Sequence, residues 1–276
     1  MNKKLLTKYS VLLVAGLGMV TPAAFSAVMP AWVGTANYLN APGAEGDESL
    51  TTNFDTYDFG NGVGAIVNAD INQSVGSTFT GYYQTYVTQH QLNGVGVNVT
   101  GLNSTGGGTG FELTMQAMFT GIYTFHNANT INFDVTGGSA ALYFDTTPNY
   151  SFTGDSGFSS PNVLLTGTID NTGSGTLKSS GIGISEFNIA GVFGNAAPNV
   201  YVPNTIDGGI ALFTINLRPN TPILNGVSSV MGKTSNLYAA DGSLQLTAVP
   251  LPATVWLFLS AFMGLLSVNK RKKIPA

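Results

Sequence analysis

Few side chains of this chain are suited to covalent or metal chemistry. The 276 residues include no Cys and only two His, His90 and His126. Without thiols there is no nucleophilic cysteine, no disulfide framework and no zinc cluster built on cysteine. Neither His is near a Gly-x-Ser-x-Gly segment, so a serine triad is not indicated. We expect both His side chains to face solvent or to lie in loops.

Carboxylates are the remaining reactive groups. Two of them at a suitable separation could hydrolyse a glycosidic bond, but no motif pairs them, and an enzyme is the least favoured function. One acidic cluster could bind calcium, which takes oxygen ligands. Its members are Glu45, Asp47, Glu48, Asp55 and Asp58. No EF-hand spacing accompanies them, so a solvated acidic loop is the preferred interpretation, with no cofactor expected.

A group of aromatic and amide side chains suggests sugar binding as an alternative function. Tyr82, Tyr83 and Tyr86, with Gln84, could supply stacking rings and hydrogen-bonding partners. Strand alternation places Tyr83 on the face opposite to Tyr82 and Tyr86. At least one of the three rings is therefore expected in the core.

The charge of the chain is unevenly distributed. Three Lys lie near the start and four basic residues near the end, which leaves Lys178, Arg218 and Lys233 between them. All 14 acidic residues lie in this middle part, whose net charge is −11. Nucleic acid is therefore not an expected partner.

The first 26 residues are typical of a signal peptide. Lys3, Lys4 and Lys8 precede an apolar run, and small residues follow Pro22. The cleavage zone comprises Ala24, Ser26 and Ala27, and cleavage is expected after Ser26. We therefore expect residues 27–248 to form an exported domain.

Residues 249–276 combine three features in a fixed order. The motif Val249-Pro250-Leu251-Pro252-Ala253 is followed by an apolar run to Val268 and by the basic cluster Lys270, Arg271, Lys272 and Lys273. Counted from Val249, about 20 residues at about 1.5 Å per residue reach roughly 30 Å, the thickness of a bilayer core. The basic residues predict that this end stays in the cytoplasm. One C-terminal transmembrane helix is expected, and a plain membrane anchor would share this pattern.

This order of motif, apolar span and basic stop resembles the PEP-CTERM sorting signal, with Leu251 where the family most often has Glu. The resemblance implies processing near Pro252 by exosortase, a membrane-embedded cysteine transpeptidase. It also implies transient contact with the inner membrane and release to the cell surface or extracellular matrix, alongside exopolysaccharide. The stretch 64–86, with 120–123 and 137–138, is similar to the flocculation-associated group of that family. That likeness implies a non-enzymatic structural or adhesive protein that promotes cell aggregation in floc or biofilm.

Residues 27–248 have the pattern of an all-β domain. Between Phe111 and Phe125, the apolar residues Phe111, Leu113, Met115, Ala117, Phe119, Tyr123 and Phe125 occupy odd positions. Glu112, Thr114 and Gln116 occupy even positions suited to solvent. Further strands are expected at 51–59, 78–88, 163–169, 183–187, 210–217 and 223–230, with loops at 103–110 and 171–180.

Three hairpin turns are expected, at Gly137-Gly138, Asp241-Gly242 and Asn93-Gly94. Each of the first two would bring apolar residues on either side of the turn onto one face. Many short strands joined by such turns predict an antiparallel β-sandwich or a jelly-roll-like domain.

Overall fold

The computed structural model describes residues 31–68, 74–104, 110–127, 130–171, 173–178, 185–206, 210–218 and 223–248. These residues form an all-β structure in which the named strands pair antiparallel, with a single turn of 3-10 helix, η1 (Tyr38–Asn40). The all-β, antiparallel prediction is confirmed. The expected signal peptide, sorting motif and C-terminal helix lie outside the described residues.

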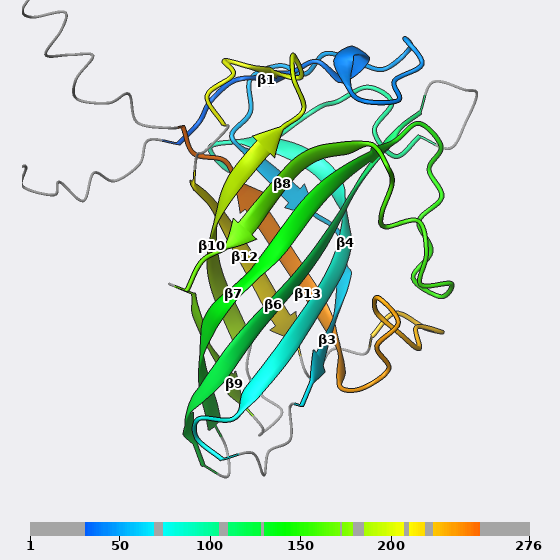
Figure 1. The fold of residues 1–276 in the computed structure, drawn as a ribbon. Coiled ribbons are helices and arrows are strands. Elements are labelled where there is room, and N and C mark those ends of the chain that lie inside the picture. The colour runs from blue at the N-terminus through cyan, green and yellow to red at the C-terminus, as the bar shows by residue number, and fades with distance from the viewer. Residues whose placement is uncertain are drawn as a thin grey trace, which may run out of the picture.

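The main sheet closes on itself (Figure 1). Its long strands are β4 (Thr78–Leu92), β6 (Glu112–His126), β7 (Thr130–Asp145), β10 (Ser185–Ala196), β12 (Ile210–Arg218) and β13 (Leu237–Gln245). The pairs β8 (Val163–Ile169) with β9 (Ser174–Lys178), and β2 (Thr56–Phe59) with β3 (Gly62–Val67), each fill one position between two long strands. Pairing of β12 with β13 completes the ring. Opposite walls therefore face one another across a common core, as two layers of a sandwich would.

Aromatic and aliphatic side chains fill the interior of the ring. Strand alternation sends Leu113, Met115, Ala117 and Phe119 of β6 inward, where they are at most 3% exposed. The core extends along the ring through Phe79, Phe133 and Leu142. These inward positions agree with the odd-numbered pattern predicted for β6, except at its end.

A segment near the start of the folded body closes one end of the ring. Residues 32–39, here called the cap, include β1 (Thr35–Ala36), which pairs with β11 (Tyr201–Val202). Trp32, Ala36 and Tyr38 point inward and are at most 1% exposed. The Trp32 backbone N–H donates to the Leu246 carbonyl, and Ala31 forms a bridge with Thr247. Both ends of the folded body therefore meet beside the cap.

Two loops form a second layer on the outside of β3 and β4 (Figure 1). The loop 146–162 contributes Phe152 and Phe158, and the loop around 223–236 contributes Val227 and Val230; they pack on Val63 and Ala65 of β3. The strand predicted at 223–230 is thus wrong, because these apolar residues cover the sheet instead of extending it.

Two of the three predicted hairpin turns are also wrong. The glycines Gly137 and Gly138 lie inside the continuous strand β7, and Asp241 and Gly242 lie inside β13. In β7 an extra residue opposite Thr120 and Gly121 forms a bulge, which reverses the alternation. The core therefore still receives residues 131, 133 and 135 from before the bulge and residues 142 and 144 from after it. The predicted turn places the same residues on one face.

The third turn is confirmed. Asn93 and Gly94 connect β4 to β5 (Val95–Val97), with Leu92 opposite Val95. Their φ angles of 53° and 77° lie in the left-handed region that an I′ turn requires. The strands expected at 78–88, 163–169 and 210–217 correspond to β4, β8 and β12. The interval 171–180 was expected to be a loop and instead contains β9.

Candidate functional site

The predicted sorting signal and cleavage zone lie at the two ends of the chain. Val249–Ala253, the basic cluster Lys270–Lys273 and the cleavage zone at 24–27 all lie outside the described residues. Within the described part of the chain, no helix has the length and hydropathy needed to cross a membrane.

His90 is buried in the core beneath the cap, which corrects the expectation of a solvent-facing or loop residue. Asp58 pairs with Gln89 and Phe59 with Val87, so Thr88 is an extra residue that bulges out of β4. The bulge shifts the alternation by one position and turns His90 inward. The side chain of the second histidine, His126, is outside the described part of the structure.

His90 belongs to a hydrogen-bonded network of buried rings. Its Nε2 lies 2.6 Å from the Tyr38 hydroxyl, which is 3.2 Å from the Tyr57 hydroxyl, which in turn is 2.9 Å from the Tyr201 hydroxyl. Burial lowers the pKa of His90 to about 3, and it raises the pKa of each tyrosine well above the usual value. All four rings are therefore neutral at physiological pH. The network is enclosed by protein, so it stabilises the capped end and offers no access to a substrate.

Glu112 is also buried, although its even position predicted exposure. The loop that follows β7 folds over the outer face of β6, and the backbone N–H groups of Asn149 and Tyr150 donate to the two Glu112 carboxylate oxygens at 3.0 and 3.5 Å. Burial raises the Glu112 pKa to about 7, against the opposing effect of these hydrogen bonds. Asp145 is its cross-strand neighbour. The pair has the composition of a hydrolytic site, but the loop occupies the position that a substrate would need.

The aromatic group proposed for sugar binding is largely covered. Tyr83 is 1% exposed in the core, and Gln84 is fully buried on the outer face with its Nε2 donating to Asp155. The ring of Tyr86 stacks on Tyr150 at 4.4 Å, and Lys233 lies 5.4 Å above the ring of Tyr82. The ring faces of Tyr82 and Tyr86 are therefore already in contact with residues of the outer loops.

The acidic cluster does not gather into a cation site. Glu48 accepts from the backbone N–H groups of Glu45 and Gly46, Asp55 accepts from Asn93 N–H and the Thr56 hydroxyl, and Asp58 accepts from Gln89. These three carboxylates thus accept hydrogen bonds from different parts of the protein and do not converge on one point. Among the described residues, no three His, Cys, Asp or Glu side chains come together as metal ligands would.

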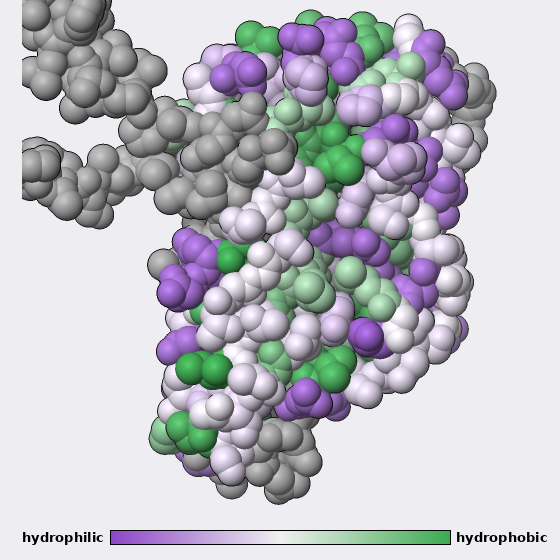
Figure 2. Space-filling model, viewed as in Figure 1, coloured by the Kyte–Doolittle hydropathy of each residue, from purple (hydrophilic) through white to green (hydrophobic). Residues whose placement is uncertain are grey.

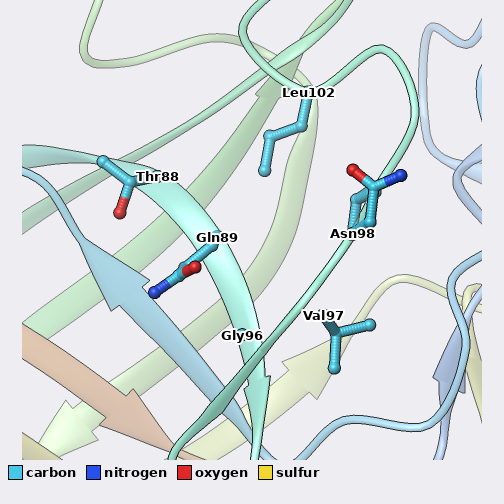
Figure 3. Close-up of a pocket in the computed structure, with 7 residues that line it drawn as sticks. Thr88, Gln89, Gly96, Val97, Asn98 and Leu102 are labelled. Atoms are coloured by element: carbon cyan, nitrogen blue, oxygen red, sulfur yellow. The ribbon is translucent and has the colours of Figure 1, made fainter.

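One surface groove, of about 390 Å³, lies beside the β4–β5 hairpin (Figure 3). Thr88 and Gln89 of β4 form one side, and Gly96 to Asn98 form the other, with Leu102 at the edge. The Gln89 amide is held by Asp58 at 2.9 Å, and Gly96 leaves room for it because a Cβ there would collide with its oxygen. Hydroxyl and amide groups therefore dominate this groove.

A second groove, of about 400 Å³, crosses the outer face of β6, β7 and β9. It is lined by Thr124, Asn132, Phe133, Asp134, Ser174, Gly175 and Thr176. The Thr176 hydroxyl donates to the Asn132 amide oxygen at 3.1 Å. Asn132 lies opposite Phe125, whose side chain is 45% exposed. We call this the β6–β9 groove.

Phe125 was expected in the core and is instead exposed. Tyr123 pairs with Phe133 but Phe125 pairs with Asn132, so Thr124 is an extra residue in β6. Like the bulge at Thr88, this bulge shifts the alternation by one position. Here the shift turns the Phe125 ring outward. Asn132 and Asp134 alternate with apolar neighbours, and this pattern predicts that both face solvent on the side of the groove. Nothing in the sequence predicts the bulge at Thr124.

No protein-family model, curated protein or solved structure matches this chain. The described residues define a closed, antiparallel all-β body with a packed interior and shallow polar grooves on its wall.

Proposed function

We propose that this chain is an exported, non-enzymatic structural or adhesive protein, sorted to the cell surface by a PEP-CTERM-like signal and taken up into an exopolysaccharide matrix. The observation that carries the proposal is the position of the signal relative to the folded body. Thr247 still bridges to Ala31, and the motif begins at Val249. A processing enzyme at the membrane would therefore meet the motif directly at the end of a completed fold.

The chemistry of the described residues supports a non-enzymatic role. His90 and Glu112 have shifted pKa values of the kind found in acid–base catalysts, but both side chains are buried within the protein. Their hydrogen bonds hold the cap and a loop in place. We infer that this body acts through its outer surface.

Sorting is tested by mass spectrometry of both termini of the protein recovered from the native cell surface and culture medium. A C-terminus near Pro252, with or without added mass, is the expected result. An intact C-terminus at Ala276, found only in inner-membrane fractions, would reject sorting and leave a plain anchored domain.

The second candidate function is carbohydrate binding, and the β6–β9 groove favours it. Lectin-like sites combine an exposed ring with neutral hydrogen-bonding groups, and Phe125 lies beside Asn132 and Thr176 in this way. The net charge of −11 between the basic ends disfavours an acidic polymer, so a neutral polysaccharide is the expected ligand.

Affinity electrophoresis in gels containing the host's own polysaccharide tests this function. Phe125→Ala should abolish any retardation, because it removes the exposed ring that lies beside Asn132 at the groove. Val75→Ala removes another exposed apolar side chain outside the groove and should not change retardation. Equal mobility of all three proteins with and without polysaccharide would reject carbohydrate binding.

A further inference from the structure

The outer face of the cap has no charged side chain and carries exposed aliphatic ones. Because Trp32, Gly34, Ala36 and Tyr38 point inward, the alternate residues point away from the core. Those outward residues are Val33, Thr35, Asn37 and Leu39, and the first and last are 45% and 43% exposed.

Two further aliphatic side chains flank this row. Val202 pairs with Thr35 on one side, and Leu50 bridges to Asn37 on the other. Their exposed fractions of 59% and 61% are among the highest for large apolar residues of the described chain. Figure 2 shows hydrophobic atoms on this upper end, between hydrophilic ones. We call Val33, Leu39, Leu50 and Val202 the cap patch.

The cap patch lies where the predicted membrane segment leaves the body. Thr247 is beside Ala31 at the edge of the cap, and the apolar run begins at Thr254. Seven residues span at most about 25 Å when fully extended. If the C-terminal segment crosses the bilayer, the cap is the part of the body held next to the lipid surface.

The distribution of charge indicates the kind of contact. The middle part of the chain has only three basic residues, and the register places two of them far from the cap. Lys178 lies opposite Thr130, at the other end of β7 from Phe144, whose ring stacks on Tyr38 of the cap. Arg218 is six residues further along β12 than Leu212, which pairs with Gln245 near the cap. The third, Lys233, lies over the ring of Tyr82 on the wall. Attraction of basic side chains to anionic headgroups therefore does not bring the cap to the membrane.

We propose that, before processing, the cap patch rests on the bilayer surface and inserts its four aliphatic side chains among the lipid headgroups. The proposal builds on the membrane tether of the proposed function. Before release the body then stands with its cap on the membrane and presents its wall, including the β6–β9 groove, away from the lipid. Because acidic residues such as Glu45 and Asp47 lie in the loop after the cap, anionic lipid should weaken the contact.

The natural absence of cysteine permits a clean test. Leu50→Cys and Val75→Cys are made in the exported chain with its C-terminal segment intact, labelled with a small fluorophore and reconstituted into phosphatidylcholine vesicles. Leu50 and Val75 are equally exposed at 61%, but Val75 lies between β3 and β4, at the end opposite the cap. Lipids brominated on their acyl chains quench a fluorophore only on contact.

The expected result is at least twofold quenching of the label at Leu50, little change at Val75, and less quenching at Leu50 when anionic lipid is added. Flotation with vesicles but no quenching at Leu50, or equal quenching at both positions, would overturn the proposed contact while leaving the tether intact. Failure of the chain to float with vesicles would reject the tether itself, and the orientation with it.

Discussion

His90 and Glu112 are two buried ionisable side chains that affect stability in opposite directions as the pH falls. The pKa of His90 is lowered to about 3 by burial, so below its ordinary value near 6.5 only the unfolded chain takes up this proton. The folded state is then disfavoured by up to ~1.4 kcal/mol per pH unit. The pKa of Glu112 is raised to about 7, so between pH 7 and its ordinary value near 4.5 the folded state binds the proton more tightly and gains stability.

Single substitutions should separate these two effects. Glu112→Gln removes the stabilisation that comes from protonating Glu112 in the folded state. The free energy of unfolding of this variant should therefore fall more steeply than that of the parent as the pH is lowered from 6.5 to 4.5. His90→Gln removes the destabilising protonation of the unfolded chain and keeps a hydrogen-bonding group for Tyr38. The stability of this variant should therefore rise as the pH falls over the same interval. Urea unfolding at three pH values measures both slopes. Parallel pH profiles for the parent and both variants would contradict this assignment.

At the scale of elements, the bulges in β4, β6 and β7 decide which side chains reach the core. Gly138 is critical in β7, because a Cβ there would meet the carbonyl oxygen of Met118 and the Cα of Phe119 on β6. These are backbone atoms of a paired strand, so neither can move without breaking the register.

Gly138→Ala should therefore lower the free energy of unfolding by about 2 kcal/mol or more. Gly154→Ala is the matched control, because the atoms nearest to its Cβ would be the side-chain hydroxyls of Ser151 and Ser156, at 3.1 Å, and no backbone atom lies as close. Thermal unfolding of the two variants gives the comparison. Equal stabilities would mean that the β6–β7 pairing is looser than the structure describes.

A single carboxylate ties the two outer loops together and joins them to β4. Asp155 accepts from Gln84 Nε2, the Ser229 hydroxyl and the backbone N–H groups of Met231 and Gly232, at 2.7–2.9 Å. Burial opposes ionisation of Asp155, but these hydrogen bonds prevail and lower its pKa.

Asp155→Ala should cost about 2 kcal/mol, since hydrogen bonds to a charged group are the stronger kind. Hydrogen exchange should rise first in the loop around 223–236, while the core strands stay protected. Asp47→Ala removes an exposed carboxylate from another loop and should change neither measurement. Unchanged exchange around 223–236 in Asp155→Ala would show that apolar packing alone holds the loop.

The sequence pattern predicts the structure where the determinants are local and does not predict it where a distant segment intervenes. The alternation of Leu113 to Phe119 and the Asn93-Gly94 turn were predicted, because period and turn chemistry are local properties. The burial of Glu112 depends on a loop 37 residues away. The orientations of His90 and Phe125 depend on one extra residue in each strand, and a bulge has no sequence signature of its own.

At the scale of the whole molecule, closure of the sheet brings the start and end of the body together. The Ala31–Thr247 bridge and the Trp32–Leu246 hydrogen bond join them. Directly opposed residues of antiparallel segments have Cα atoms about 4.5–5.5 Å apart, within the range for a disulfide.

The double variant Ala31→Cys, Thr247→Cys should therefore form an intramolecular disulfide on oxidation and unfold at a higher temperature than its reduced form. Mass spectrometry of a proteolytic digest identifies the bond. Ala31→Cys with Val75→Cys serves as the control pair, because those positions lie toward opposite ends of the ring. Efficient cross-linking of the control would indicate contacts between molecules.

Closure of the ring also determines how the body would bear a mechanical load. A tether at the C-terminus pulls on β13 along its own axis, and β13 is hydrogen-bonded to β12 on one side and to β2 and β3 on the other. Tension must then shear both borders at once, because no free edge allows the bonds to open one by one. Single-molecule pulling through the C-terminus against the opposite end of the wall should accordingly show one high rupture force.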